Sequence, residues 1–168
     1  NNETSPKMVS AIDITTDATK LSNVGEYDIT ISGGEAKNYE ITNYINGKLA
    51  VTKAPLTITA KNFTKIYGSI NPEFKYSYNG AKNNDSEGAI FETLPTISCV
   101  ADETSNVGVY EIEIGDASSN NYEILYKSGI LSVVKREIIV STKNYTRIYG
   151  EENPNFEISY NGFVNKQK

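Results

Sequence analysis

The strongest constraint on the fold of this chain is that its sequence repeats itself after about 82 residues. Residues 61–68 (KNFTKIYG) return as residues 143–150 (KNYTRIYG), and residues 22–25 (SNVG) return as residues 105–108. Self-similarity at a fixed period of this size is the signature of an array of small structural units. The chain must therefore fold as copies of one small domain, and not as a single large domain.

Three ranges follow from the repeat. Residues 1–53 supply the C-terminal part of a preceding copy, residues 54–135 form a complete copy, and residues 136–168 supply the N-terminal part of a following copy. No Gly- or Ser-rich linker separates the copies, so we expect an array of them to form a stiff rod. The two partial copies are complementary halves of one unit with open strand edges, and we expect chains to associate head to tail.

Alternation of apolar and polar residues predicts strands in the complete copy. Asp85 is the expected N-cap of a short helix over residues 85–92, with Ile90, Phe91 and Leu94 facing the sheet. We expect five or six strands per copy, at residues 56–60, 74–78, 96–100, 110–114, 122–124 and 130–134. This order predicts an α+β, β-dominated fold of tandem small β-grasp-like domains with one short helix per repeat. The alternative is an all-β immunoglobulin-like sandwich.

One repeated motif joins the first two expected strands. It combines a Tyr-Gly pair with an Asn-Pro pair, residue types that favour chain reversal. We therefore interpret the motif as structural, and its members in the two copies are Tyr67, Gly68, Asn71, Pro72, Tyr149, Gly150, Asn153 and Pro154.

Composition excludes several classes of function. The net charge is −5 and basic residues are interleaved with acidic ones, which disfavours nucleic-acid binding. The chain has no histidine and one cysteine, Cys99, whose equivalent in the preceding copy is Thr16, and this argues against a nucleophilic site, a disulfide framework and a zinc site. No apolar stretch is long enough for a membrane-spanning helix, so we expect no membrane insertion in this segment.

The acidic residues do not point to catalysis or metal binding either. Glu111 and Glu113 alternate with apolar residues on one expected strand, which indicates a solvated strand face. Asp102, Glu103 and Asp116 are not spaced as in a calcium-binding loop. We expect no catalytic residues, no cofactor and no metal.

The repeated motifs resemble those of a known family, the MBG domain of the YGX type. The resemblance rests on the following segments: LTITA (56–60), IYG (66–68), NP (71–72), YSY (76–78), PTI (95–97), VGVY (107–110), NYEI (121–124) and GILSV (129–133). It implies a tandem repeat in a large secreted or surface-attached bacterial protein of the adhesin-like kind, a kind that is also linked to mucin binding. The family supplies no catalytic residues.

We therefore expect a non-catalytic stalk or spacer at the bacterial cell surface or outside the cell, with adjacent repeats of the same chain as partners. The alternative is a module that itself binds host glycan, mucin or matrix protein, which multivalency would strengthen. Exposed aromatic rings can stack on sugars. The candidate ligand contacts are Tyr67, Tyr76, Tyr78 and Tyr126.

Overall fold

The computed structural model describes residues 8–165 and 167, which form two compact units. Unit 1 contains the described residues up to Leu56 together with residues 80–94 and 117–125. Unit 2 contains residues 57–79, 95–116 and those from 126 onward. The division passes through strands β4 (Ala54–Ala60) and β9 (Tyr122–Lys127), so the complete repeat contributes to both units.

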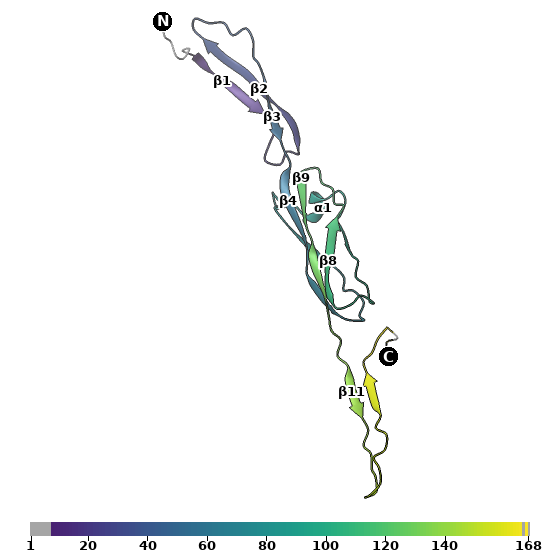
Figure 1. The fold of residues 1–168 in the computed structure, drawn as a ribbon. Helices are drawn as coiled ribbons and strands as arrows, with labels where there is room; N and C mark the ends of the chain where they lie inside the picture. The colour runs from purple at the N-terminus through teal and green to yellow at the C-terminus, as the bar shows by residue number, and fades with distance from the viewer. Residues whose placement is uncertain (1–7, 166, 168) are drawn as a thin grey trace. The chain divides into compact units, whose positions relative to one another are not determined.

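The main element of unit 1 is an antiparallel sheet with the strand order β1-β2-β3 (Figure 1). Its strands are β1 (Met8–Thr16), β2 (Gly25–Ala36) and β3 (Gly47–Val51). Along β2, Tyr27, Ile29 and Ile31 are half-buried and alternate with exposed residues, as the sequence pattern predicted.

Unit 1 also holds the one α-helix of the described residues, α1 (Glu87–Ile90). The predicted helix is confirmed, and Ile90 and Phe91 are buried. The prediction of Asp85 as N-cap is wrong: the N-cap is Ser86, and the Asp85 carboxylate instead accepts a hydrogen bond from the Tyr122 hydroxyl. The prediction that Leu94 faces the sheet is wrong: the helix ends at Ile90, and Leu94 beyond it is exposed.

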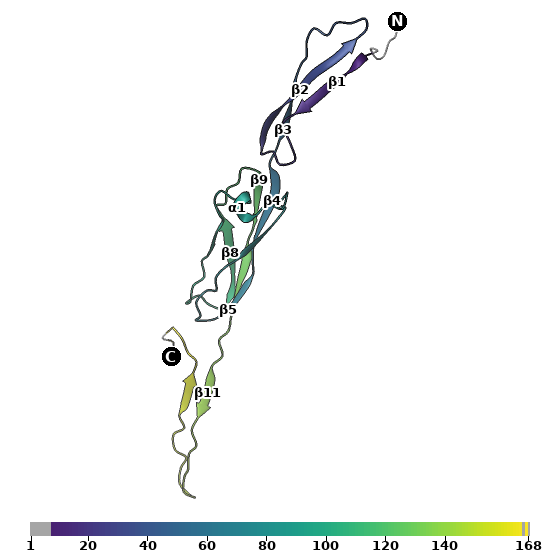
Figure 2. The ribbon, with the colours of Figure 1, turned by 180° about the vertical axis from the view of Figure 1, so that it is seen from behind.

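Unit 2 is built around a four-stranded sheet with the order β5-β10-β8-β7. Figure 2 labels two of its strands, β5 and β8. Its strands are β5 (Phe63–Ile66), β10 (Gly129–Val134), β8 (Gly108–Gly115) and β7 (Thr96–Cys99). Strand β5 runs parallel to β10, whereas β8 is antiparallel to both of its neighbours.

Two further pairings complete unit 2. Strand β6 (Tyr76–Asn79) pairs antiparallel with residues 57–60 of β4, in a sheet of order β6-β4-β9. Strands β11 (Ile139–Thr142) and β12 (Ile158–Asn161) form an antiparallel pair.

The predicted strand faces are confirmed. Ile58 on β4, Ile112 on β8 and Leu131 on β10 are fully buried. Glu111 and Glu113 are exposed, and the apolar residues with which they alternate on β8 are half-buried or buried. Burying a large aliphatic side chain contributes about 1.5–3 kcal/mol, so these positions are principal contributors to stability.

The structure confirms a β-dominated fold with one short helix and several small sheets. The predicted number of strands is wrong: residues 54–135 contain seven strands, because the unpredicted β5 follows β4 after two residues. Strand β5 is only four residues long and carries a charged residue at its third position, so it shows no apolar alternation of useful length. Of the helices described, none is long and apolar enough to cross a membrane.

Candidate functional site

The Tyr-Gly motif forms a tight turn directly after β5. Gly68 has a φ of +79°, a conformation that residues with a side chain rarely adopt. The Lys65 ammonium is buried, and it donates hydrogen bonds to the carbonyls of Ser69 (3.2 Å) and Asp102. A buried cation requires such partners, so the turn and the loop at residue 102 are fixed to one another.

The next copy of the motif makes the same turn. Gly150 has a φ of +92°, and Arg147 donates to the carbonyl of Glu151 (3.0 Å), as Lys65 does to Ser69. The turn geometry therefore comes from the motif itself and recurs in both copies.

In unit 2 the Tyr-Gly turn contacts the following repeat. Arg136 Nε donates to the Tyr67 carbonyl (3.0 Å), and Gln167 Nε2 donates to the Tyr67 hydroxyl (3.0 Å). A Cβ atom added to Gly68 would lie 2.3 Å from Val164 Cγ2. Glycine is therefore needed at position 68 for its backbone conformation and also for the close packing of Val164.

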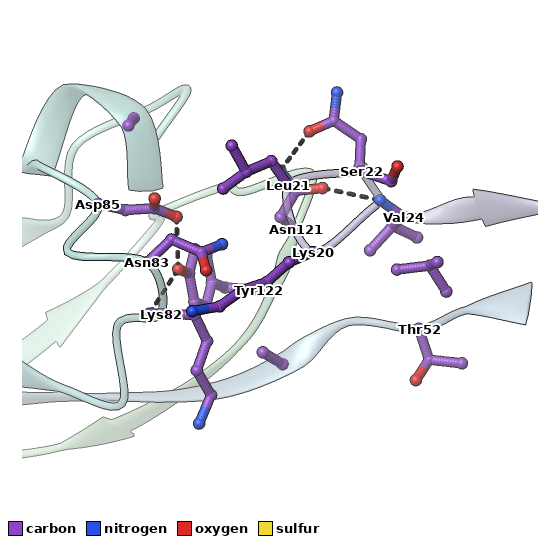
Figure 3. Close-up of a pocket in the computed structure, with 14 residues that line it drawn as sticks. Lys20, Leu21, Ser22, Val24, Thr52, Lys82, Asn83, Asp85, Asn121 and Tyr122 are labelled. Atoms are coloured by element: carbon purple, nitrogen blue, oxygen red, sulfur yellow. Dashed lines mark hydrogen bonds between the residues drawn. The ribbon is translucent and has the colours of Figure 1, made fainter. Parts of the chain in front are cut away.

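A second junction between repeats lies within unit 1 (Figure 3). The Val24 backbone N–H donates to Asn121 Oδ1 (2.9 Å), and Asn121 Nδ2 donates to Asn23 Oδ1 (2.8 Å). The Asn121 carbonyl accepts from the Ala54 backbone N–H (3.0 Å), so Asn121 connects residues 23–24 to the start of β4. Nearby, Lys53 Nζ donates to the Ser119 carbonyl (2.8 Å).

Asn23, Val24, Ala54 and Asn121 line a pocket of about 470 Å³. Within it, the buried Tyr122 hydroxyl donates to Asp85 Oδ2 (2.6 Å) and accepts from the Lys82 backbone N–H (2.8 Å) (Figure 3). Burial of the ring, and next the hydrogen bond to Asp85, raise the pKa of Tyr122 above its ordinary value of 10.0. The phenol therefore stays protonated and keeps donating to the carboxylate.

The junction role of Asn23 and Asn121 was not predicted from the sequence. Both belong to repeated motifs, SNVG and NYEI, in which an asparagine has no role in strand alternation. Their recurrence could have indicated this role, because a polar residue that is repeated outside the alternating pattern of a strand indicates a specific hydrogen bond.

The four predicted ligand tyrosines lie on three different elements of unit 2. Tyr67 is in the junction turn, Tyr76 and Tyr78 are on β6 opposite Ala60 and Ile58 of β4, and Tyr126 is on β9. Tyr126 is exposed, and the other three are half-buried.

The remaining candidate residues have structural surroundings. Cys99 is half-buried on β7. The Asp102 carboxylate accepts hydrogen bonds from the hydroxyl (2.7 Å) and backbone N–H (2.8 Å) of Thr104 and from the Ser105 hydroxyl (3.1 Å), and these bonds lower its pKa. Asp116 accepts a hydrogen bond from the Thr96 hydroxyl. Across residues 8–165 and 167, no group of three or more Cys, Asp or Glu side chains could hold a metal ion.

Comparison with known proteins gives one finding. A model of the family described as MBG domain (YGX type) matches residues 1–50 and 56–132, which is more than half of the chain. The two matched segments fall inside the ranges 1–53 and 54–135 that the internal repeat defines. No curated protein and no solved structure matches the chain.

Proposed function

Because the chain belongs to the MBG domain family of the YGX type, we propose that it is a non-catalytic stalk segment of a large bacterial surface or secreted protein. Membership of this family indicates a repeat module of a surface protein. In the proposed role, consecutive repeats hold a distal binding region away from the cell.

The observation that carries this proposal is the way one repeat passes into the next. Only Thr52 and Lys53 separate β3 from β4, and Lys53 is itself hydrogen-bonded to the Ser119 carbonyl. At the next junction four residues separate β10 from β11, and one of them, Arg136, is hydrogen-bonded to Tyr67. A short connection whose side chains form hydrogen bonds with the neighbouring repeat resists bending, as a stalk requires.

Small-angle X-ray scattering tests the proposal on the chain as it exists. We expect a scattering curve that one elongated particle reproduces. Inserting four Gly-Ser residues between Thr52 and Lys53 should broaden the distribution of particle dimensions, since it releases the junction. Identical curves for the two proteins would contradict a stalk, because the natural connection would then be as flexible as the inserted linker.

We also propose that the complete repeat has the β-grasp-like arrangement and not the immunoglobulin-like one. Two features support this choice: β5 near the start of the repeat runs parallel to β10 at its end, and the helix α1 lies between β6 and β7 in the chain. The sheets β6-β4-β9 and β5-β10-β8-β7 are distinct in the structure. An experimental structure in which their faces pack against each other, as the two sheets of a sandwich do, would contradict the β-grasp-like arrangement.

Direct binding of host glycan, mucin or matrix protein is the second candidate function. The exposed ring of Tyr126 supports it, since aromatic rings stack on sugar faces. The test is binding to immobilised mucin and a glycan panel, with a folded Tyr126→Ala variant beside the natural chain. Saturable binding that the variant loses would establish this function, and no binding would leave the stalk role.

A further inference from the structure

The outer face of the four-stranded sheet of unit 2 carries exposed aliphatic side chains. Ile130 and Val134 of β10 are 44% and 42% exposed, Val109 of β8 is 71% exposed and Ile66 of β5 is 49% exposed. The solvent face of an antiparallel strand pair ordinarily carries polar side chains. Aliphatic side chains that gather on such a face indicate an interaction surface.

These four side chains are neighbours. Val134 lies directly opposite Ile66 on the parallel strand β5. Val109 lies opposite Ser132, which places it diagonally across from both Ile130 and Val134. We call the set Ile66, Val109, Ile130 and Val134 the aliphatic patch, and all four residues lie within the complete repeat.

The preceding copy indicates that the fold does not require the aliphatic patch. At three of the four positions that copy has polar or charged residues: Glu26, Lys48 and Thr52 in place of Val109, Ile130 and Val134. All three are exposed although the complete repeat follows them, so a following repeat leaves this face open. The aliphatic patch is therefore a property of the complete repeat and not of the shared fold.

A carboxylate beside the aliphatic patch lacks the partner that its equivalent has in the preceding copy. There, Lys48 Nζ lies 2.5 Å from Asp28 Oδ1 across the pair of strands β2 and β3. In the complete repeat Glu111 replaces Asp28 and Ile130 replaces Lys48, and the two residues again lie opposite each other. Among the described residues, none forms an ion pair with Glu111. The face thus combines aliphatic surface with an available negative charge.

This combination favours one class of partner. The residues that β5, β10, β8 and β7 expose on this face include no aromatic ring on which a sugar could stack. Glu111 and Glu113 would repel the phosphates of a nucleic acid or of an anionic lipid surface. A protein segment with aliphatic side chains and a basic residue would match both the apolar area and the charge.

We propose that the outer face of β5, β10 and β8 binds a protein segment that carries aliphatic side chains next to a lysine or arginine. The aliphatic side chains of the partner cover the aliphatic patch, and its cation pairs with Glu111 as Lys48 pairs with Asp28. The site is separate from Tyr126, which lies on β9. It goes beyond the stalk role and does not depend on it.

An NMR titration of the whole chain tests the proposal. The probe is a short synthetic peptide in which lysine and valine alternate, and its control has glutamate in place of lysine. We expect the first peptide to cause saturable shifts of backbone amide signals on β5, β8 and β10, and the second to cause none. No saturable shifts, shifts confined to other elements, or equal binding of the two peptides would overturn the proposal.

Ile130→Lys gives the complete repeat the lysine of the preceding copy, a residue that this fold accepts at the equivalent position. The new side chain pairs with Glu111 and repels the cationic peptide, so we expect binding at least about tenfold weaker. The matched control Leu125→Lys adds the same charge at an exposed aliphatic position of β9 and should bind as the natural chain does. Equal affinities of the natural chain and Ile130→Lys would contradict the proposed site.

Glu111→Gln tests the charge separately from the aliphatic surface. It removes the carboxylate with little change in size, and we expect the lysine-containing peptide to bind about fivefold more weakly, a loss at the upper end for one exposed ion pair. The circular dichroism spectrum should stay unchanged. An unchanged affinity would overturn the proposed pairing. Shifts of the same amide signals with protein concentration alone would identify a second copy of the chain as the occupant, and would overturn the proposal as well.

Discussion

At the residue scale, Tyr122 connects strand β9 to the loop before α1 through one hydroxyl group. Tyr122→Phe removes the donor to Asp85 and the acceptor of the Lys82 backbone N–H. We expect a loss of about 1–2 kcal/mol in the free energy of unfolding at neutral pH, the usual cost of a broken buried hydrogen bond. Denaturant titration measures it.

The same substitution should change the response to high pH. The pKa of Tyr122 is raised in the folded chain, so its contribution to stability is complete below pH about 10 and is lost as the pH rises through the raised folded value. Stability of the natural chain should therefore fall more steeply above pH 10 than that of Tyr122→Phe. The control is Tyr39→Phe at the equivalent exposed position, which should cost less than about 0.5 kcal/mol.

Gly68 combines a backbone constraint with a packing constraint. Gly68→Ala should destabilise the chain by about 1–3 kcal/mol, because alanine resists a φ of +79° and its Cβ would overlap Val164. Gly150→Ala isolates the backbone part, since nothing lies within 4 Å of an added Cβ there. Denaturant midpoints measure both variants, and equal losses would show that the Val164 contact adds nothing.

Single residues also show which features of the structure could be predicted from the sequence and which could not. The buried faces of β4, β8 and β10 were predictable because alternation is a local pattern that the two faces of a strand impose. The sequence could not predict that Ser86 and not Asp85 is the N-cap of α1. The Asp85 carboxylate instead accepts a hydrogen bond from Tyr122, which lies 37 residues away in the sequence. Asn121 likewise finds its partner Asn23 at a separation of 98 residues.

At the scale of elements, strand β5, which was not predicted, depends on its pairing with β10. Its residues, Phe63–Ile66, form a strand because β10 lies alongside and supplies parallel backbone hydrogen bonds. In the following copy the equivalent residues 145–148 are not assigned to a strand. The sequence is nearly the same, so the tertiary environment decides whether this segment is a strand.

The junction between the first two repeats depends on Asn121. Asn121→Ala removes the hydrogen bonds to the Val24 N–H and the Asn23 side chain, and we expect the Val24 amide to exchange with deuterium several-fold faster. Hydrogen exchange followed by NMR measures this. Asn38→Ala, at the equivalent position of the first repeat, should leave the Val24 exchange rate unchanged. An unchanged rate in Asn121→Ala would exclude Asn121 as the support of this junction.

At the scale of the whole molecule, stability should be unevenly distributed among the repeats. Leu131→Ala opens a cavity in the complete repeat and should cost about 2–5 kcal/mol. Leu49→Ala, at the equivalent position of β3, where the side chain is 39% exposed, should cost less than about 1 kcal/mol. Denaturant unfolding compares the two, and similar losses would mean that the first repeat is packed as tightly as the second.

The contact between Gly68 and Val164 has a consequence for how such a gene can change. Gly68 and Val164 belong to different copies of the repeat, as do Asn23 and Asn121. Unequal recombination that adds or deletes whole copies keeps both interfaces intact only when every copy carries compatible residues on its two ends. Selection should therefore hold these end residues uniform along an array while exposed strand faces diverge from copy to copy.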